Sequence, residues 1–516
     1  MDHTIRAELP AAFTARMRES LGAEAEAFFA SYETPRAYGL RYNPLKTEQE
    51  HFVRLMPFEL EPVPWAREGC YYKEGERPGR HPFHEMGLYY IQEPSAMCVA
   101  HLADPRPGER VLDLCAAPGG KATQLAGRLA GEGLLVCNEP VPGRAKILSQ
   151  NIERMGIRNA VVLNHTPQEL ERRFPAFFDK IVVDAPCSGE GMFHKEQAAL
   201  TEWSSENVMR CAARQREILA SAAAMLCPGG VLVYSTCTFA PEENEEIVAW
   251  FLEEFPEFRP ALIDTAALGL SGGVLPGTVR IYPHRQRGEG HFAAKLQKGG
   301  AGCGAGASMA GAQSEEGIVG MACRARNGAD LEQMANGAWC DAAEMECGVK
   351  DDAAETVRGT QGSRRDGNGK RAGYPDGKGG KSPEGWRAYE MFAKQMLFEP
   401  PRGRREMFGE QLYLLPEQMP DIRGFKVLRP GLHLGTNKKN RFEPSHALAL
   451  ALKAEQVSQC FETQDAEKYL RGETLVCDAS LSGWTLVTYR GLPLGWGKAS
   501  RGVMKNHYPK GLRISW

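Results

Sequence analysis

Five short apolar segments that alternate with helical patterns constrain the fold of this 516-residue chain more than any other feature. Each segment is rich in Val, Leu and Ile; they are 110–115, 133–139, 160–165, 179–185 and 230–237. Helical patterns, such as those over 143–155 and 207–226, separate several of them. Apolar strands that alternate with helices are typical of a parallel sheet covered on both faces. Two further segments, 279–283 and 291–297, are predicted to form a closing pair of strands.

The α/β region, placed at 93–298, is predicted to follow a small α+β domain at 1–92. Apolar residues at helical spacing predict a core-packing helix over 10–32, and 39–46 and 62–65 are predicted to be short strands and turns. The loop 77–84 carries Arg80, His81 and His84, which could touch phosphate, although a solvated surface loop is the preferred interpretation.

The segment 299–385 breaks the pattern because it is crowded with Gly, Ala, Ser and mixed charges and contains few large apolar residues. We expect a disordered linker, since such a composition buries too little surface to offset the chain entropy of ordering. Order is predicted to return in a compact α+β or barrel-like domain at 386–516, with strands at 408–415, 424–428, 484–489 and 492–496 and a helix at 445–455. Its basic residues from 497 to 513 lie among His507 and Tyr508, a mixture that suits contacts with an RNA backbone and with stacked bases, although a solvated terminal face is the alternative.

Composition excludes several classes of protein. A formal net charge of −3 argues against coating nucleic acid by bulk charge, so any RNA contact is expected from local basic patches. The fourteen cysteines include no Cys-x-x-Cys pair, which favours reduced thiols over a disulfide framework and predicts no metal site. The first residues lack the order of a signal peptide, and no apolar run reaches the roughly 18 residues that span a bilayer. We therefore expect a cytoplasmic protein without a membrane partner.

A cofactor site is predicted where the strand that begins at Val111 enters a helix through Ala117-Pro-Gly-Gly120. Such a turn presents backbone N–H groups at the positive end of a helix, where an anionic group can bind. The next strand ends at Glu139, nineteen residues after Gly120, close to the offset of about 20 at which a carboxylate meets ribose hydroxyls. Dinucleotide and Walker motifs are absent. Together with Asp113 and two cysteine-bearing strand ends, the turn predicts S-adenosylmethionine as the cofactor. We expect the carboxylate of the cofactor to bind at the turn and its ribose to bind Glu139. The alternative is that the turn is a plain joint between a strand and a helix.

Two cysteines, Cys187 and Cys237, follow strands whose carboxyl ends should meet the cofactor at one edge of the sheet. A thiolate that adds to C6 of cytosine makes C5 nucleophilic enough to take a methyl group, and the thiol is eliminated once the C5 proton leaves. A helix start at Pro241 is expected to favour the thiolate of Cys237. Asp184 is expected to hold the N3/N4 edge of the base. The other strand-end and helix cysteines at 98, 137, 211 and 227 are expected to be buried core thiols.

The chain resembles the RsmF-type branch of the Sun family of RNA cytosine-C5 methyltransferases. Three motifs carry the resemblance: Leu114-Cys-Ala-Ala-Pro-Gly-Gly-Lys121, Asp184-Ala-Pro-Cys-Ser-Gly-Glu-Gly191 and Tyr234-Ser-Thr-Cys-Thr238. The stretches at 39–46, 87–95 and 505–509 also match, so the resemblance covers nearly the whole chain except the linker.

The resemblance implies a Rossmann-like methyltransferase domain, an N-terminal α+β domain that helps to bind RNA, and a C-terminal PUA-like α+β domain. It implies that Cys237 is the nucleophile and that Cys187 promotes release of the product. It also implies cofactor contacts from Glu139, from Asp184 and from the turn residues Cys115, Ala116, Ala117, Pro118, Gly119, Gly120 and Lys121. The implied substrate is 16S rRNA or the small ribosomal subunit. An adenine-side Asp is common in the family after the third strand, but 164–168 reads Asn-His-Thr-Pro-Gln here, so that contact stays unassigned.

Three other functions stay open at this point. A transfer RNA cytosine-C5 methyltransferase would use the same pocket, because a flipped cytosine is recognised in either case. A non-catalytic ribosome-assembly factor would keep the fold but would not need both thiols and the intact turn. A small-molecule methyltransferase would not need the basic C-terminal domain.

Overall fold

The computed structural model describes residues 9–300, 383–439 and 441–514. The predicted linker therefore lies outside the described residues, apart from its ends: residues 299–300 follow the central sheet, and α12 (Pro383–Met396) begins before the predicted boundary. The cysteines at 303, 323, 340 and 347 lie outside as well. In the described ranges, none of the helices has the length and apolar character needed to cross a bilayer.

The N-terminal region forms a helical pair and a small antiparallel sheet. The expected helix over 10–32 is two helices, α1 (Ala11–Leu21) and α2 (Ala25–Ser31), separated at Gly22, which has a φ of 53°. The sheet has the order β2-β3-β1-β4, with the bounds β1 Tyr38–Tyr42, β2 Glu61–Pro62, β3 Gly69–Tyr72 and β4 Tyr89–Ile91. The helix α3 (Gln49–Leu55) connects β1 to β2.

The loop expected to be solvated at 77–84 is solvated only in part: Arg77 and Arg80 are exposed, whereas 82–84 are buried. Pro78–Arg80 forms a 3₁₀ turn and α4 (Pro82–Glu85) follows it, with the His81 side chain accepting from the amide of Phe83. His84 is buried and its Nδ1 lies 3.0 Å from Glu85 Oε1. The ring nitrogens of His81 and His84 therefore make contacts within α4. Phe83, which lies between them, packs in the core.

The central sheet confirms the predicted parallel α/β architecture. Its order is β11-β12-β13-β9-β8-β5-β6-β7-β16, and the strands β5 to β9 pair in parallel. Their bounds are β5 Arg110–Asp113, β6 Leu134–Asn138, β7 Ala160–Leu163, β8 Phe178–Asp184 and β9 Leu226–Thr236. The expected closing pair is present as β12 (Thr278–Ile281) and β13 (His291–Lys298), which run antiparallel to each other, and β13 runs antiparallel to β9. Two short strands, β10 (Phe258–Pro260) and β11 (Ser271–Gly272), complete this edge.

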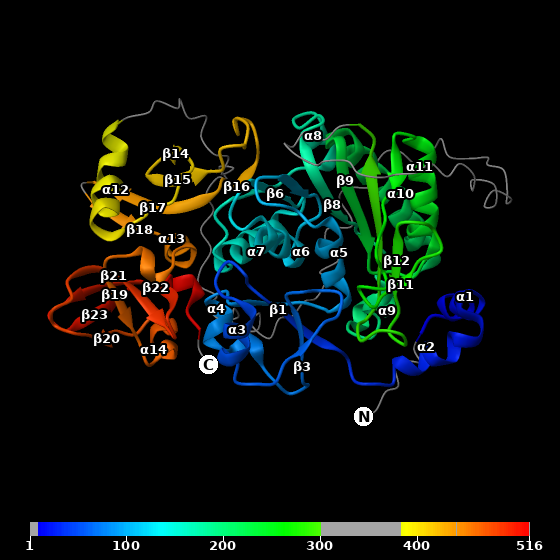
Figure 1. Ribbon diagram of the computed structural model, residues 1–516, viewed down its shortest axis with the longest axis horizontal. Coiled ribbons are helices and arrows are strands. Elements are labelled where there is room, and N and C mark those ends of the chain that lie inside the picture. The colour runs from blue at the N-terminus through cyan, green and yellow to red at the C-terminus, as the bar shows by residue number, and fades with distance from the viewer. Residues whose placement is uncertain (1–8, 301–382, 440, 515–516) are drawn as a thin grey trace, which may run out of the picture.

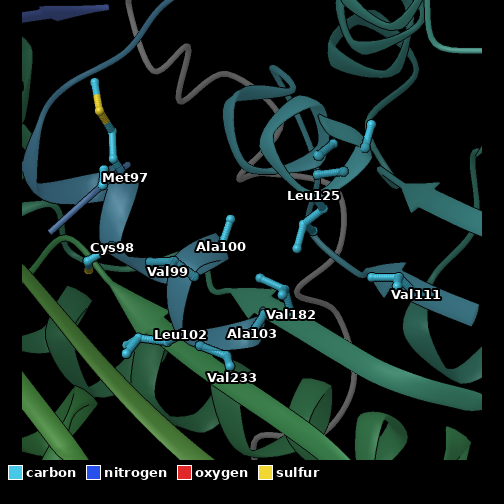
Figure 2. Close-up of a cluster of buried hydrophobic side chains, with 14 of the residues drawn as sticks. Met97, Cys98, Val99, Ala100, Leu102, Ala103, Val111, Leu125, Val182 and Val233 are labelled. Carbon is cyan, nitrogen blue, oxygen red and sulfur yellow. The ribbon is translucent and has the colours of Figure 1, made fainter. Parts of the chain in front are cut away.

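Helices cover both faces of this sheet, which explains why its strands are apolar on both sides (Figure 1). One face packs against α5 (Cys98–Ala103), α6 (Gly120–Leu129) and α7 (Pro142–Arg154). Figure 2 shows part of this core, where Val99 and Leu102 of α5 lie beside Val182 and Val233 of the sheet. The other face packs against helices of which the longest is α10, with the bounds α8 Pro167–Glu171, α10 Ser205–Met225 and α11 Glu245–Glu254. The short helix α9 (Gln197–Glu202) lies outside these layers and packs near α1.

The C-terminal region forms two small sheets, which lie on one side of the molecule in Figure 1. The first has the order β14-β15-β17-β18, with the bounds β14 Arg404–Phe408, β15 Gln411–Leu415, β17 Leu432–Lys438 and β18 Arg441–Pro444. The second has the order β19-β21-β22-β23-β20, with the bounds β19 Cys460–Glu462, β20 Leu475–Val476, β21 Gly483–Tyr489, β22 Leu492–Ser500 and β23 Val503–Asn506. The helices are α13 (His446–Ala451) and α14 (Ala466–Leu470).

Three predictions for this region are wrong. The single strand expected at 408–415 is a hairpin, because Gly409, at a φ of 60°, turns the chain between β14 and β15. The strand expected at 424–428 is β16 (Val427–Arg429), which leaves the C-terminal sheets and pairs with β7 of the central sheet. Tyr508 is 3% exposed and packs against His446 and Tyr469, so it is not available to stack on a base.

Candidate active site

The carboxyl ends of the parallel strands bring the predicted side chains to one edge of the sheet. The strand order β9-β8-β5-β6 places Asp184 of β8 beside Asp113 of β5, and Glu139 directly follows β6. Parallel strands connected by helices on both faces leave a crevice beyond their carboxyl ends, and this crevice is where such sheets bind ligands.

The turn between β5 and α6 is fixed by hydrogen bonds from two side chains of α7. Arg144 Nη2 donates to the Ala117 carbonyl at 3.0 Å, and Asn151 Nδ2 donates to the Pro118 carbonyl at 2.9 Å. Gly119 has a φ of 120°, and a Cβ there would lie 3.3 Å from Leu148 and 3.4 Å from Asn151. The turn therefore needs glycine for its backbone conformation, and two of its carbonyls are occupied by side chains of α7.

Two carboxyl groups flank this turn in a buried setting. Glu139 accepts from the amide of Val141 at 2.9 Å and lies 3.3 Å from the Arg144 guanidinium; burial raises its pKa against the opposing charge of Arg144. Asp113 is fully buried and has no side-chain hydrogen-bond partner among the described residues, while a backbone hydrogen bond from Cys115 acts to lower its pKa. Burial, together with the negative charge of Asp184, raises the pKa of Asp113 to about 7.

The two cysteines predicted to share a pocket are in contact, with 3.3 Å between Cys187 Sγ and Cys237 Sγ. The hydrogen bond to Cys237, together with burial, raises the pKa of Cys187 well above its ordinary value. Either sulfur can act as the donor in this contact. The raised pKa keeps Cys187 a protonated thiol, which leaves Cys237 as the candidate nucleophile of the pair.

Asp184 lies at the centre of a polar cluster beside the cysteines. Its Oδ2 accepts from Lys121 Nζ at 2.6 Å and its Oδ1 accepts from Ser235 Oγ at 2.8 Å. Burial acts to raise the pKa of Asp184, but the charges of Lys121 and His291 and these hydrogen bonds outweigh it and lower the pKa. Asp184 is thus an ionised acceptor, and Lys121, which like Asp184 is predicted to contact the cofactor, pairs with it.

The loop after Cys187 is fixed by a buried carboxyl group. Glu243 accepts from the Ser188 amide at 3.0 Å and from Gln215 Nε2 at 2.8 Å, and it also accepts from the Ser188 hydroxyl. Burial raises the pKa of Glu243 to about 7 against these hydrogen bonds. The Gly191 amide donates to the Cys237 carbonyl at 2.8 Å, which ties the two cysteine loops together.

The expectation that a helix beginning at Pro241 stabilises the thiolate is wrong. Residues 241–243 form one 3₁₀ turn, and α11 begins at Glu245, eight residues beyond Cys237. In the described structure, Cys237 Sγ instead lies against the thiol of Cys187.

The prediction missed His291, the first residue of β13. His291 is 3% exposed, and its Nε2 lies 3.7 Å from Asp184 Oδ1. This Nε2 has no hydrogen-bond partner in the described structure, and burial lowers the pKa of His291 to about 3. Because β13 runs against β9, its amino end reaches the edge where the parallel strands end. A polar residue that opens a closing strand was the available signal.

The segment 164–168, where no adenine contact was assigned, is committed to the local fold. Asn164 Nδ2 donates to the carbonyls of Glu139 and Pro140, and Thr166 and Glu169 form a capping box at the start of α8. The His165 Nε2 accepts from the amide of Lys426 at 2.8 Å. Within the described ranges, no cluster of three or more His, Cys, Asp or Glu is arranged to hold a metal ion.

Four family models match consecutive parts of the chain. The model described as 16S rRNA methyltransferase RsmB/F matches residues 100–297, and the N-terminal domain of 16S rRNA methyltransferase RsmF matches 9–94. The RsmF rRNA methyltransferase first C-terminal domain matches 391–452, and the methyltransferase RsmF PUA domain matches 461–514. The region predicted as one PUA-like domain is thus divided into two units, which correspond to its two sheets.

Individual proteins agree with these models. The chain is 38% identical over 309 residues to ribosomal RNA small subunit methyltransferase F of Pectobacterium atrosepticum, covering 57% of this chain and 63% of the relative. It is 38% identical over 312 residues to the protein of the same name from Escherichia coli, covering 57% and 64%. The chain therefore matches less than two thirds of the length of these relatives. A methyltransferase homolog protein from Pyrococcus horikoshii has a solved structure that is 28% identical, with a TM-score of 0.51, and the match covers 58% of this chain and all of that one. The chain belongs to the RsmF-type branch of the 16S rRNA methyltransferase family.

Proposed function

We propose that this protein transfers a methyl group from S-adenosylmethionine to C5 of a cytosine in 16S rRNA, through a covalent bond between Cys237 and C6. The observation that carries the proposal is the contact of Cys187 and Cys237, 3.3 Å apart, beside an ionised Asp184 at the ligand-binding edge of the sheet. The 16S rRNA named for the family is the proposed substrate. We propose that the protein acts in the cytoplasm. Its substrate is either naked 16S rRNA or the rRNA within the small subunit.

The buried groups at the edge of β5 and β6 fit S-adenosylmethionine. Asp113 has no side-chain hydrogen-bond partner in the described structure, so its carboxyl group suits the cationic amino group of a methionine moiety. The amides at the start of α6, from Gly120 on, suit its carboxylate, and Glu139 suits ribose hydroxyls. We accordingly assign the turn 115–120 and Glu139 to the cofactor, with Asp184 and Lys121 at the border between cofactor and base. When bound, S-adenosylmethionine supplies an electrophilic methyl group on a sulfonium.

The reaction of the base follows from the two thiols. The Cys237 thiolate would attack C6 to form a C–S bond, and the electrons of the C5–C6 double bond would make C5 nucleophilic; C5 would then bond to the methyl carbon as the methyl–sulfonium bond breaks and S-adenosylhomocysteine leaves. Transfer of the C5 proton to a base would then restore the double bond and break the C–S bond, which returns the Cys237 thiolate. Asp184 is placed by Lys121 and Ser235 to accept from the N4 amino group of the base.

Cys187 supports the release step of this sequence. Its thiol lies 3.3 Å from Cys237 Sγ, and after methylation its proton is available to the departing Cys237 sulfur, which makes that sulfur a better leaving group. We assign methyl transfer to residues 93–298, and RNA binding to residues 1–92 and the region from 386 onward.

The proposal is tested by methyl transfer from labelled S-adenosylmethionine to unmodified small subunits, naked 16S rRNA and transfer RNA in parallel. The expected result is 5-methylcytosine in the subunit or its RNA, absent with Cys237→Ala, which should still bind S-adenosylhomocysteine. Label in transfer RNA alone would replace the substrate with that of a transfer RNA methyltransferase. Absence of label from every RNA would contradict the proposal and favour a non-catalytic assembly factor.

A further inference from the structure

A cavity of about 310 Å³ lies beside the catalytic loops, between the N-terminal sheet and the chain that enters β13. Its walls include Tyr38 of β1, Tyr71 and Tyr72 of β3, and Arg287 and Glu289 of the segment before β13. None of these residues belongs to the cofactor edge or to the cysteine pair. The volume is that of a small-ligand site.

The far wall of the cavity is in contact with the catalytic loop. Glu289 lines the cavity, its carboxylate lies 3.1 Å from His194 Nδ1, and its amide donates to Glu93 at 2.9 Å. The next residue, Gly290, meets the cysteine loop: a Cβ on Gly191 would lie 2.9 Å from the carbonyl oxygens of both Gly290 and Cys237. An RNA strand that delivers a base to Cys237 therefore has its neighbouring nucleotide within reach of this cavity.

The aromatic side chains of the cavity are held as rigid platforms. Tyr38 and Tyr72 are cross-strand partners with ring centroids 5.6 Å apart, and the Tyr71 hydroxyl donates to the Arg287 carbonyl at 2.9 Å. The guanidinium of Arg287 lies 4.1 Å from the centre of the Tyr71 ring, and that of Arg36 lies 5.4 Å from the centre of the Tyr38 ring. Tyrosine rings and stacked guanidinium planes are the surfaces on which single-stranded bases stack.

The charges of the cavity distinguish a base from a phosphate. Four glutamates and three Arg or Lys side chains line it, so it offers a phosphate group no net attraction. Three of the carboxylates are paired within the protein, Glu59 with Lys73, Glu61 with Arg287 and Glu289 with His194. Each carboxylate keeps further lone pairs that can accept from the exocyclic amino groups of adenine, cytosine and guanine, which uracil lacks. The lining therefore favours an unstacked base that carries an amino group.

We propose that this cavity binds the base of an RNA nucleotide adjacent to the methylated cytosine, with preference for an amino-bearing base over uracil. This inference rests on the proposed function, because it takes the RNA substrate as its ligand. Tyr38 and Tyr72, which are half-buried, supply the stacking surfaces, whereas Tyr71 is buried and anchors the wall beneath Arg287. The subsite positions the strand and takes no part in the chemistry.

The test uses the full-length protein with unmodified 16S rRNA and small subunits. Ultraviolet crosslinking followed by trypsin digestion is expected to place a nucleotide on the peptide of residues 68–73, which contains Tyr71 and Tyr72. Tyr72→Ala is expected to raise the KM for RNA about tenfold with kcat within about twofold, since stacking on one aromatic ring contributes to binding but not to the chemical step. Tyr72→Phe keeps the ring and is expected to match the wild type.

The crosslink and the KM for RNA together decide the proposal. A crosslink on residues 68–73 together with the raised KM supports it, whereas an uncrosslinked peptide and an unchanged KM overturn it. If Tyr72→Ala does not fold, Arg36→Gln takes its place, with the same expected rise in KM. If the wild type methylates no RNA, the proposed function fails, and the crosslink alone then decides whether the cavity binds a base.

Discussion

The N-terminal sheet is predicted to hold the cofactor turn in place through one buried guanidinium, that of Arg41. Arg41 is 1% exposed; its Nε donates to Gln92 Oε1 at 2.8 Å, and its Nη2 donates to the Gly120 carbonyl at 2.7 Å and to Thr123 Oγ1 at 2.9 Å. Burial lowers the pKa of Arg41 to about 10, so the guanidinium remains charged at neutral pH. Two of the three bonds end on the first turn of α6, where the cofactor carboxylate is proposed to bind.

The substitution Arg41→Met keeps much of the apolar stem and removes all three hydrogen bonds. Hydrogen bonds from a charged donor contribute about 1.5–3 kcal/mol each. The Gly120 carbonyl still accepts from the Thr123 hydroxyl at 3.2 Å, and removal of the charge relieves some burial cost, so the net loss is about 3 kcal/mol. In a domain of this size that corresponds to a fall in melting temperature of roughly 6–12 °C. The affinity for S-adenosylhomocysteine should also fall several-fold, because Gly120 is no longer held.

The assay is thermal unfolding followed by circular dichroism, with calorimetric titration of S-adenosylhomocysteine on the same samples. Arg106→Met is the matched control, because Arg106 is 72% exposed and pairs with Asp104 at the surface, where such pairs contribute about 0–1 kcal/mol. A melting temperature for Arg41→Met within 2 °C of the control, with unchanged affinity, would refute the reasoning.

Two further perturbations test other parts of the account. Glu243 has a folded pKa of about 7 against an ordinary value of 4.5, so the folded state holds the proton more tightly and stability falls as pH rises from 4.5 to 7. Glu243→Gln cannot ionise, and its melting temperature should therefore decline less than that of the wild type between pH 5 and pH 8; parallel profiles would count against this. Arg429 of β16 pairs with Glu153 and donates to Ser149 Oγ at 3.2 Å, which docks the C-terminal region on α7. Arg429→Met should cost about 2–3 kcal/mol and speed hydrogen exchange in β16 and β7, and unchanged exchange rates would show that the docking does not depend on it.

The central sheet could be predicted from sequence because its signals are local. Apolar runs, helical spacing and the turn at 117–120 each lie within a few residues, and parallel pairing then brings all carboxyl ends to one edge. This geometry is sufficient to bring Cys187 and Cys237 together, although they lie 50 residues apart. The contact required no knowledge of distant segments.

Features that depend on long-range packing escaped prediction. The strand β16 pairs with β7 across more than 260 residues of sequence, and nothing local distinguishes it from a strand of the C-terminal sheets. The hydroxyl group of Tyr508 is compatible with a surface position, but its ring packs against His446 and Tyr469. His291 lies at the site because β13 is reversed, and the direction of a closing strand follows from the sheet as a whole.

The most direct test of the account is the trapping of the covalent intermediate. Cys187→Ala removes the thiol 3.3 Å from Cys237, so the bond between Cys237 and C6 should form and then fail to break. After incubation with 16S rRNA and S-adenosylmethionine, a denaturant-resistant protein–RNA band is expected, and mass spectrometry of the digested band should place the nucleotide on Cys237. The doubly substituted Cys187→Ala, Cys237→Ala protein should give no band. No band with Cys187→Ala, or a nucleotide attached to another residue, would contradict the assigned roles of the two cysteines.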